Sequence, residues 1–468
     1  MQYSVVNYKT VKENSDFRVD ADYFRPDFLN SLKLVKSHKN FALSEIGNVN
    51  GGKRLPLNED FSDDGIPYIR AEDIKNGFVQ YENSPKISLK LHEFLKRYQT
   101  KKDDVLITIV GNSIGDVGIV KFDLKKCNLT ENCAKVTNLQ NIIPEFLFAF
   151  LLSRHGQIQI NRERVGTAQP KLALERIRKF RIPAFSHDFQ NKFSKIINQA
   201  NLLIDQSKSL YSQAEGLVLE ELGLAEWKPE HTLSFVKNFS EAEQADRYDA
   251  EYFQPKYEKI VSAIKKYKGG FDVIKGQFKP NKKTFKKIAD KEFRYIEIGC
   301  VNISDGSMEP VILHGSELPA NAKIKFQKND VIISKVRPYR GAIGIVDCDD
   351  YVGSGAFTVL QENGIINKET LMVFLRLKPL LDFSLKFNTG TSYPTITDED
   401  ILNFPLPKID SKIQEQIKEK ITEMCETKKL SKSLLEITKR GVEMAIEKNE
   451  EEAKKWIDGE VAKLEIKL

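Results

Sequence analysis

Two short loops in the sequence carry side chains that are suited to binding phosphates and hydrogen-bonding ligand edges. The residues concerned are Asn112 and Ser113 in "GNSIGD" (111–116), and Lys335, Arg337, Tyr339 and Arg340 in and before "RPYRGA" (337–342). Arginine forks suit phosphates and guanine edges, whereas amide and hydroxyl groups suit other base edges. Each loop is therefore a candidate recognition loop. A surface hairpin with tolerated variation would show the same pattern.

Weaker candidates lie outside these loops. They are Lys53 and Arg54 in "GGKRL", Arg70 in "YIRAEDIKNG", and two pairs at matching positions around a proline, Gln169 with Lys171 and Tyr393 with Thr395. A basic cluster also fills 162–181, with five arginines and two lysines. Such density suits a phosphate backbone, and a solvated turn or helix face is the alternative.

Motifs for catalysis are missing from the sequence. It contains no GxxxxGK[ST] phosphate loop, no NPP[YF] or DPP[YF] tetrapeptide and no nucleophile beside a base. The five cysteines are scattered and the histidines are isolated, so no zinc spacing appears. We therefore expect a binding protein with no metal and no catalytic residue, whose cysteines are reduced thiols.

The loops and turns occur twice along the chain. "RVDADYFRPDF" (18–28) returns as "RYDAEYFQPKY" (247–257), and "DVLITIVGNSIGDVGIV" (104–120) returns as "DVIISKVRPYRGAIGIV" (330–346) with eight of seventeen residues identical. "GTAQPKLALERIRKFRIP" (166–183) returns as "GTSYPTITDEDILNFPLP" (390–407). The spacings are 229, 226 and 224 residues. Matches that keep both order and spacing indicate tandem duplication of a whole domain.

Each copy has a mixed pattern of short β-rich runs, separated by Gly, Asn and Asp, and flanking helical segments. This pattern predicts an α+β module with a largely antiparallel sheet and helices to one side. Segments 48–103 and 274–329 agree poorly apart from a tyrosine-led strand. Two modules that share their motifs but differ in the segments between these motifs are homologous. The differences indicate that the two modules recognise different ligands.

A long helical pattern follows each copy. In the first, apolar or small residues from Phe189 to Leu217 alternate in steps of four and three, with Ser207 in the seam, which is a heptad period. The second is less regular, has Lys428 near its seam, and runs into the charged tail "EKNEEEAKKW". We expect an antiparallel coiled coil with pseudo-two-fold symmetry, although each helix packing on its own module is an alternative. The predicted domains are 1–185 and 226–408, each a recognition domain, with spacer helices at 186–225 and 409–468.

Composition fits a multidomain globular chain. The sequence has 468 residues, 41% hydrophobic and 29% charged, with a formal net charge of +6. A mildly basic balance is compatible with a polyanion partner without identifying one. No apolar run reaches the length of a signal peptide or a membrane span. We therefore expect a cytoplasmic protein with no membrane partner.

These doubled features resemble the specificity subunit of type I restriction–modification enzymes. The resemblance covers essentially the whole chain and rests on the "DADYF.P"/"DAEYF.P" segments, the "DVLITIVGN…GIV" hairpin and the "GT…P…I…F…P" exits before long helices. It implies two target-recognition domains, each recognising half of a bipartite, asymmetric site in double-stranded DNA. It also implies that the helices dock two methyltransferase subunits, with two restriction subunits where a nuclease–translocase is present.

The resemblance implies that this chain holds no cofactor. S-adenosylmethionine would be bound by the methyltransferase partner, and ATP with Mg by the nuclease–translocase partner. Two other functions fit parts of the sequence: a single-chain DNA methyltransferase or nuclease, and a coiled-coil scaffold with no DNA role. Turnover by the chain alone would indicate the first, and absence of salt-dependent DNA binding would indicate the second.

Overall fold

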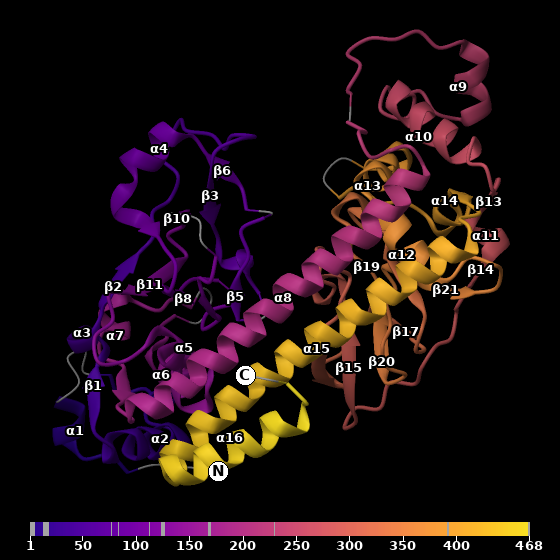
Figure 1. The fold of residues 1–468 in the computed structure, drawn as a ribbon. Helices are drawn as coiled ribbons and strands as arrows, with labels where there is room; N and C mark the ends of the chain where they lie inside the picture. Colours follow the sequence, from indigo (N-terminus) through magenta and orange to yellow (C-terminus); the bar gives the residue numbers. More distant parts are fainter. Residues whose placement is uncertain are drawn as a thin grey trace. The chain divides into compact units, whose positions relative to one another are not determined.

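The computed structural model describes residues 5–12, 18–75, 77–82, 84–111, 113–122, 127–166, 170–228, 230–390 and 393–466. The chain divides into two units (Figure 1). Unit 1 comprises residues 1–204 and 428–468, and unit 2 comprises 205–427. Each unit therefore combines one copy of the repeat with one half of each long helix.

Unit 1 contains three sheets. Their strand orders are β1-β12, β2-β11-β8-β9-β5-β4 and β6-β3-β10-β7. The strands are β1 (Asn40–Ala42), β2 (Asn48–Gly51), β3 (Ile66–Ile69), β4 (Ile74–Lys75), β5 (Phe78–Val79), β6 (Lys86–Ile87), β7 (Gln99–Thr100), β8 (Val105–Thr108), β9 (Val117–Ile119), β10 (Cys127–Leu129), β11 (Cys133–Thr137) and β12 (Arg181–Pro183). Most neighbours are antiparallel, whereas β3 runs parallel to β10 and β5 runs parallel to β9.

Unit 2 repeats this topology with the orders β13-β22, β14-β21-β18-β19 and β16-β15-β20-β17. Its strands are β13 (Phe271–Val273), β14 (Phe278–Pro280), β15 (Glu292–Ile296), β16 (Val311–His314), β17 (Ala322–Lys325), β18 (Val331–Ser334), β19 (Ile343–Ile345), β20 (Tyr351–Ser354), β21 (Phe357–Glu362) and β22 (Pro405–Pro407). Here too the counterpart pair, β15 and β20, is parallel. The α+β class and the domain duplication are confirmed, and the β4–β5 pair is an addition in unit 1.

Helices also correspond between the units. In unit 1 they are α2 (Pro26–Ser37), α3 (Leu43–Ile46), α5 (Pro144–Leu152), α6 (Arg154–Glu163) and α7 (Leu174–Ile177), beside α1 (Tyr8–Lys12) and α4 (Leu89–Phe94). In unit 2 they are α10 (Pro255–Lys265), α11 (Ile274–Gln277), α12 (Lys368–Arg376), α13 (Lys378–Phe383) and α14 (Asp398–Leu402), beside α9 (Phe239–Ala245). Both α2 and α10 begin with the proline of the repeated motif, whose fixed φ suits the first helical position.

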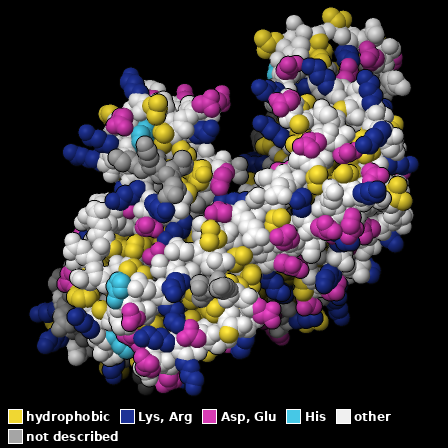
Figure 2. Space-filling model, in the orientation of Figure 1, with side chains coloured by type: hydrophobic (Ala, Val, Ile, Leu, Met, Phe, Trp, Pro, Cys, Tyr) yellow, Lys and Arg dark blue, Asp and Glu magenta, His cyan; other side chains and the backbone are white. Residues whose placement is uncertain are grey.

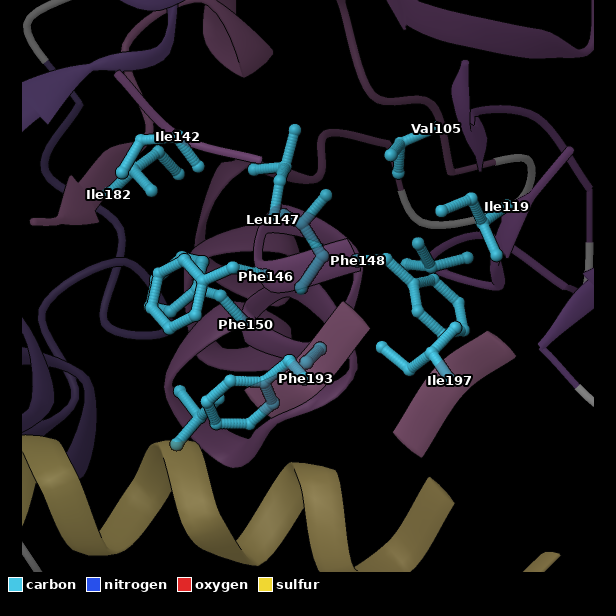
Figure 3. Close-up of a cluster of buried hydrophobic side chains, with 14 of the residues drawn as sticks. Val105, Ile119, Ile142, Phe146, Leu147, Phe148, Phe150, Ile182, Phe193 and Ile197 are labelled. Carbon is cyan, nitrogen blue, oxygen red and sulfur yellow. The ribbon is translucent and has the colours of Figure 1, made fainter. Parts of the chain in front are cut away.

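The core of unit 1 is centred on helix α5, which is apolar on all sides. Phe146, Phe148 and Phe150 are fully buried, among strand residues such as Val105 and Ile119 (Figure 3). Phe193 closes the cluster from the first long helix, with its ring centroid 5.4 Å from that of Phe146. A helix that is hydrophobic all round must be covered on all sides, and here the sheet and the long helix cover it.

The two long helices are α8 (His187–Glu221) and α15 (Ser411–Glu447). In unit 2, Gln206 bonds Glu423 and Lys420 bonds Gln213, so residue numbers rise on one helix as they fall on the other. In unit 1, the buried Ser431 hydroxyl donates to the Ala200 carbonyl at 2.8 Å. The antiparallel pairing is confirmed within each unit, with Ser207, Thr427 and Ser431 buried in the seam.

The C-terminal segment differs from the prediction of one spacer helix over 409–468. Helix α15 ends at Glu447, and Asn449 caps a separate helix, α16 (Glu450–Lys463). Ala453, Ile457 and Val461 of α16 are buried in the core of unit 1. A Cβ on Gly441 of α15 would lie 2.6 Å from Ile457, so a glycine permits this close approach. The charges of the tail therefore lie on one face of an amphipathic helix.

The stability of unit 1 should depend on the α8 seam. Replacing the fully buried Phe193 with alanine should lower the free energy of unfolding by about 3–5 kcal/mol, because a cavity remains beside α5. The matched control is Leu202→Ala on the same helix, where Leu202 is 60% exposed and a change within about 0.5 kcal/mol is expected. Urea unfolding followed by circular dichroism measures both, and equal effects would contradict the burial of Phe193.

Candidate nucleic-acid interface

The hairpin and the residues that flank the Gly-Thr pair (165 with 170–172 in unit 1, 389 with 394–396 in unit 2), which are distant in sequence, lie side by side in both units. In unit 1, Lys171 forms β-bridges with both Val110 and Val165. In unit 2, Thr395 bridges Val336 and Thr389 in the same way. Leu172 donates its N–H to the Ile109 carbonyl, and Ile396 donates to the Lys335 carbonyl, each at 3.0 Å. The structure therefore joins the two variable segments of each repeat into one surface.

In unit 2 this surface carries a cation–π pair. Arg337 has a left-handed backbone (φ 48°), and its N–H donates to the Pro394 carbonyl at 2.8 Å. Its guanidinium lies 4.8 Å from the ring centroid of Tyr393, which is 68% exposed. A guanidinium stacked on an aromatic ring is held in a defined orientation by the cation–π contact. Arg337 belongs to the hairpin loop and Tyr393 to the segment before Pro394, and the two side chains form one stacked pair.

The other predicted residues of unit 2 lie around this pair. Lys335 forms an ion pair with Asp398 at 3.2 Å. The 3-10 helix Pro338–Arg340 holds Tyr339 half-buried and Arg340 exposed. Thr395 is fixed by two backbone bonds with Thr389. Arg340 and the Arg337–Tyr393 pair are consequently the groups best placed to meet a ligand.

In unit 1 the same surface has smaller polar groups. Ser113 is half-buried and its carbonyl accepts the N–H of Asp116 at 3.0 Å. The side chain of Lys171 is exposed beside the bridge. Asn112 and Gln169, the other two predicted residues, lie outside the described residues.

In each unit, one side chain of the module donates a hydrogen bond to a backbone carbonyl of the hairpin loop. The carbonyl that accepts it is at the same position of the loop in both copies. In unit 1, the Gln157 amide donates to the carbonyl of Gly115 at 3.0 Å. In unit 2, Arg376 donates to the carbonyl of Gly341, the counterpart of Gly115, at 2.6 Å. Both glycines have positive φ, 98° and 76°, so the loop turns sharply at the supported carbonyl. Neither supporting residue was predicted from the sequence.

Arg376 is the centre of a buried network. Its side chain also donates to the Ile343 and Ile303 carbonyls at 3.0 and 2.8 Å, and to the Tyr211 hydroxyl of α8 at 2.6 Å. Arg376 itself is only 5% exposed. Burial raises the pKa of the neighbouring Glu215, and the charge of Arg376 opposes that rise. One arginine therefore connects the recognition loop to the long helix within unit 2.

The arginine of the repeated "R.DA.YF.P" motif donates hydrogen bonds to backbone carbonyls that precede the Gly-Thr pair. Arg18 pairs with Asp20 at 2.7 Å and donates to the carbonyls of Arg162 and Arg164 just before the turn. In unit 2, Arg247 pairs with Asp249 at 2.6 Å and donates to the Asn388 carbonyl. Because equivalent bonds occur in both units, we attribute the recurrence of this motif to its role in holding the backbone that precedes the Gly-Thr pair.

The basic cluster of 162–181 is largely turned inward. The Arg162 side chain is 14% exposed and stacks 3.6 Å from the Tyr23 ring centroid, and burial lowers its pKa. Arg176 pairs with Glu163 at 3.2 Å and Arg178 donates to the Val49 carbonyl at 2.9 Å. These three guanidinium groups hold the module together, and phosphate binding by the other basic residues of the cluster stays a prediction.

The remaining candidates of unit 1 have internal partners as well. Arg54 pairs with Glu131 at 2.6 Å, and Arg70 pairs with Asp73 at 3.2 Å beside the 3-10 helix Ala71–Asp73. Lys53 has an exposed side chain, while its N–H donates to the Leu129 carbonyl at 2.8 Å. Contact of these three residues with a ligand stays a prediction.

The described residues show neither a metal site nor a membrane-spanning helix. Within them, no group of three His, Cys, Asp or Glu side chains could hold a metal ion. In the same ranges, no helix has the length and apolarity that crossing a membrane requires. On the face drawn in Figure 2, basic and acidic side chains are interspersed, so no single sign of charge marks a ligand surface there.

Part of the chain is similar to a known protein family. Residues 36–215 match the family model of the type I restriction modification DNA specificity domain. The specificity subunit of the type I restriction enzyme EcoBI from Escherichia coli is 31% identical over 137 residues. That match covers 29% of this chain and 28% of the relative.

Solved structures show similarity over a longer span. The type I restriction–modification S subunit from M. genitalium matches with 15% identity and a TM-score of 0.38, over 86% of this chain and 93% of that one. The HsdS subunit from Thermoanaerobacter tengcongensis matches with 17% identity and a TM-score of 0.29, over 86% and 96%.

The support from Arg376 should be measurable in the chain alone. Arg376→Lys keeps the charge but cannot reproduce the four bonds of the fork, so the free energy of unfolding of unit 2 should fall by about 2–3 kcal/mol. Amide exchange should also accelerate in 337–343. The exposed Lys378→Gln on the adjacent α13 should change neither. A variant with unchanged exchange in this loop would show that Arg376 does not hold it.

Proposed function

We propose that this chain, whose residues 36–215 match the model of the type I restriction modification DNA specificity domain, is the DNA-specificity subunit of a type I restriction–modification complex. The observation that carries the proposal is the joined surface of hairpin loop and Gly-Thr turn. It is built by the same backbone bridges in both units and bears different side chains in each. A repeated frame with different side chains suits recognition of two different half-sites.

The chemistry of the two surfaces supports DNA as the ligand. Unit 2 presents Arg340 and the Arg337–Tyr393 pair, and an arginine can bond two acceptors of guanine at once. Unit 1 presents Ser113 and Lys171, which suit a hydroxyl contact and a phosphate contact. We assign one half of an asymmetric, bipartite site to each unit.

The long helices support a role in spacing and assembly. Helices α8 and α15 each contribute to both units, so each links one recognition surface with the other along the chain. We propose that two methyltransferase subunits dock on this chain, and that restriction subunits join them in a complete system. S-adenosylmethionine then belongs to the methyltransferase, and ATP with Mg to the restriction subunit. The reaction itself takes place outside this chain.

Two alternative functions would give different experimental results. A single-chain enzyme would methylate or cut DNA without a partner, so purified chain would transfer labelled methyl groups by itself. A scaffold without a DNA role would leave its methyltransferase complex unable to distinguish DNA sequences. Methylation mapping in cells that carry this chain and its partner separates all three, because only a specificity subunit yields one bipartite methylated sequence.

The Arg337–Tyr393 pair should determine part of one half-site. Arg337→Ala should relax specificity at a position in the half-site of unit 2, at a cost of about 1–3 kcal/mol in discrimination, and leave the other half unchanged. Methylation mapping and competition binding with single-base variants measure this.

A matched control is available in the same unit. Arg294 also stacks on a tyrosine, Tyr351, at 4.8 Å, but it lies on β15, in a different sheet from the hairpin strands β18 and β19. Arg294→Ala should leave the recognised sequence unchanged. Relaxation of both halves by Arg337→Ala would contradict the independence of the two units.

A further inference from the structure

Unit 2 contains a lysine-rich segment that the recognition surface does not include. Residues 281–291, here called the lysine arm, connect β14 to β15 and contain one aspartate and five lysines: Lys282, Lys283, Lys286, Lys287 and Lys291. All five are exposed. Lys323 and Lys325 are exposed on the adjacent strand β17. Asp290 and Glu292, at the end of the arm, are its nearest acidic residues in sequence.

The arm is held to the sheet by specific bonds. The N–H of Lys325 donates to the Lys283 carbonyl at 2.8 Å, and Thr284 bridges Ile324. Phe285 packs its ring 5.4 Å from that of Phe293. Lys287 donates to the Pro319 carbonyl at 2.7 Å. The backbone of the arm therefore has a defined position along β17, with its lysines toward solvent.

A buried polar residue fixes the start of the arm. Asn281 is 6% exposed, and its amide donates to the carboxylate of the buried Asp330 at 2.6 Å. Its side-chain oxygen accepts the N–H of Lys283 at 3.0 Å. Asp330 in turn accepts from Gln361 at 2.9 Å. Since this network is satisfied inside the module, the positive charge outside it is presented on an ordered support.

These lysines lack internal charge partners. Among the described residues, none of the five arm lysines, nor Lys323 or Lys325, forms an ion pair, whereas Lys335 pairs with Asp398 and Lys275 with Glu399 in the same unit. Seven cations without an acidic partner, five on the arm and two on the adjacent β17, repel one another. A polyanion placed along them relieves this repulsion and releases its own counterions.

The counterpart in unit 1 has the opposite charge. Residues 52–65 connect β2 to β3, the strands that match β14 and β15 in sheet order and direction. They contain two basic residues, Lys53 and Arg54, and four acidic ones: Glu59, Asp60, Asp63 and Asp64. Arg54 is already paired with Glu131. The duplicated frame thus carries a basic connection in one unit and an acidic one in the other.

We infer that the lysine arm is a sequence-independent binding site for the phosphate backbone of DNA, and that unit 2 supplies this electrostatic anchoring for the whole chain. The inference rests on the proposed function for the identity of the polyanion. Unit 1, with its acidic connection, contributes recognition without a matching anchor. The two copies of the repeat therefore differ in role as well as in the sequence that they recognise.

The test compares salt dependence in the complete methyltransferase complex. Lys282, Lys283 and Lys286 are replaced together by glutamine, and binding is measured with labelled duplexes that contain or lack the methylated site. Each phosphate contact contributes about 0.9 to the slope of log K against log salt, so the slope should fall by up to about 2.7. Between about 50 and 200 mM salt, wild-type should then lose up to roughly 40-fold more affinity than the variant.

A matched variant controls for net charge. Lys265, Lys266 and Lys268 of the same unit are exposed at the end of α10, and their replacement by glutamine removes the same charge. This variant should keep the wild-type slope. The arm variant should lose affinity equally for both duplexes and keep the methylated sequence. Thermal unfolding monitors folding of both variants.

The outcomes separate this inference from the proposed function. An unchanged slope in the arm variant overturns the inference. Loss of assembly with the methyltransferase at an unchanged slope also overturns it, and would identify the arm as a protein-docking surface. Equal wild-type affinity for both duplexes would instead overturn the proposed half-site recognition, and the slope comparison would still decide the role of the arm.

Discussion

The backbone bridge between the hairpin and the Gly-Thr turn is the contact on which the recognition surface depends. It joins Val110 to Lys171 and Val336 to Thr395, through main-chain groups. Main-chain hydrogen bonds depend little on the type of side chain. The residues of both loops can therefore change while the β-bridge is kept. For this reason the two modules can share one topology and still present different side chains. It also explains why the framing glycines and prolines recur, since they set the path of the backbone.

The support behind the loops shows how far such variation extends. Gln157 and Arg376 meet the same carbonyl, but a buried arginine needs more partners than an amide. Unit 2 provides them with two further carbonyls and the Tyr211 hydroxyl, which offset the loss of hydration of the cation. The neutral Gln157 needs only a second carbonyl, that of Leu151. As a result, the loop of unit 2 is tied to helix α8, whereas that of unit 1 is tied to its own module.

Backbone features were predictable from the sequence, and side-chain direction was not. The duplication, the hairpins and the long helices follow from patterns of apolar, glycine and proline residues, which report local geometry. Arg162 and Arg176 look like a basic surface because sequence shows charge without showing burial, and they prove to be internal. Helix α16 was missed because its apolar positions are sparse between charged residues. The pairing of Arg337 with Tyr393 joins segments more than fifty residues apart, and only the folded sheet brings them together.

The asymmetry of charge between the units has a consequence for specificity. Contacts with phosphates add affinity for every DNA sequence alike, whereas contacts with base edges discriminate. Because both units belong to one chain, an anchor in unit 2 raises the local concentration of DNA at unit 1 as well. A second anchor in unit 1 would strengthen binding to wrong and right sequences together. The acidic connection of 52–65 would oppose such binding, so the DNA affinity that we propose for unit 1 would depend mainly on its base contacts. Under this inference, one anchored and one unanchored module hold non-matching DNA more weakly than two anchored ones would, while the ratio of affinities for matching and non-matching sequences stays the same.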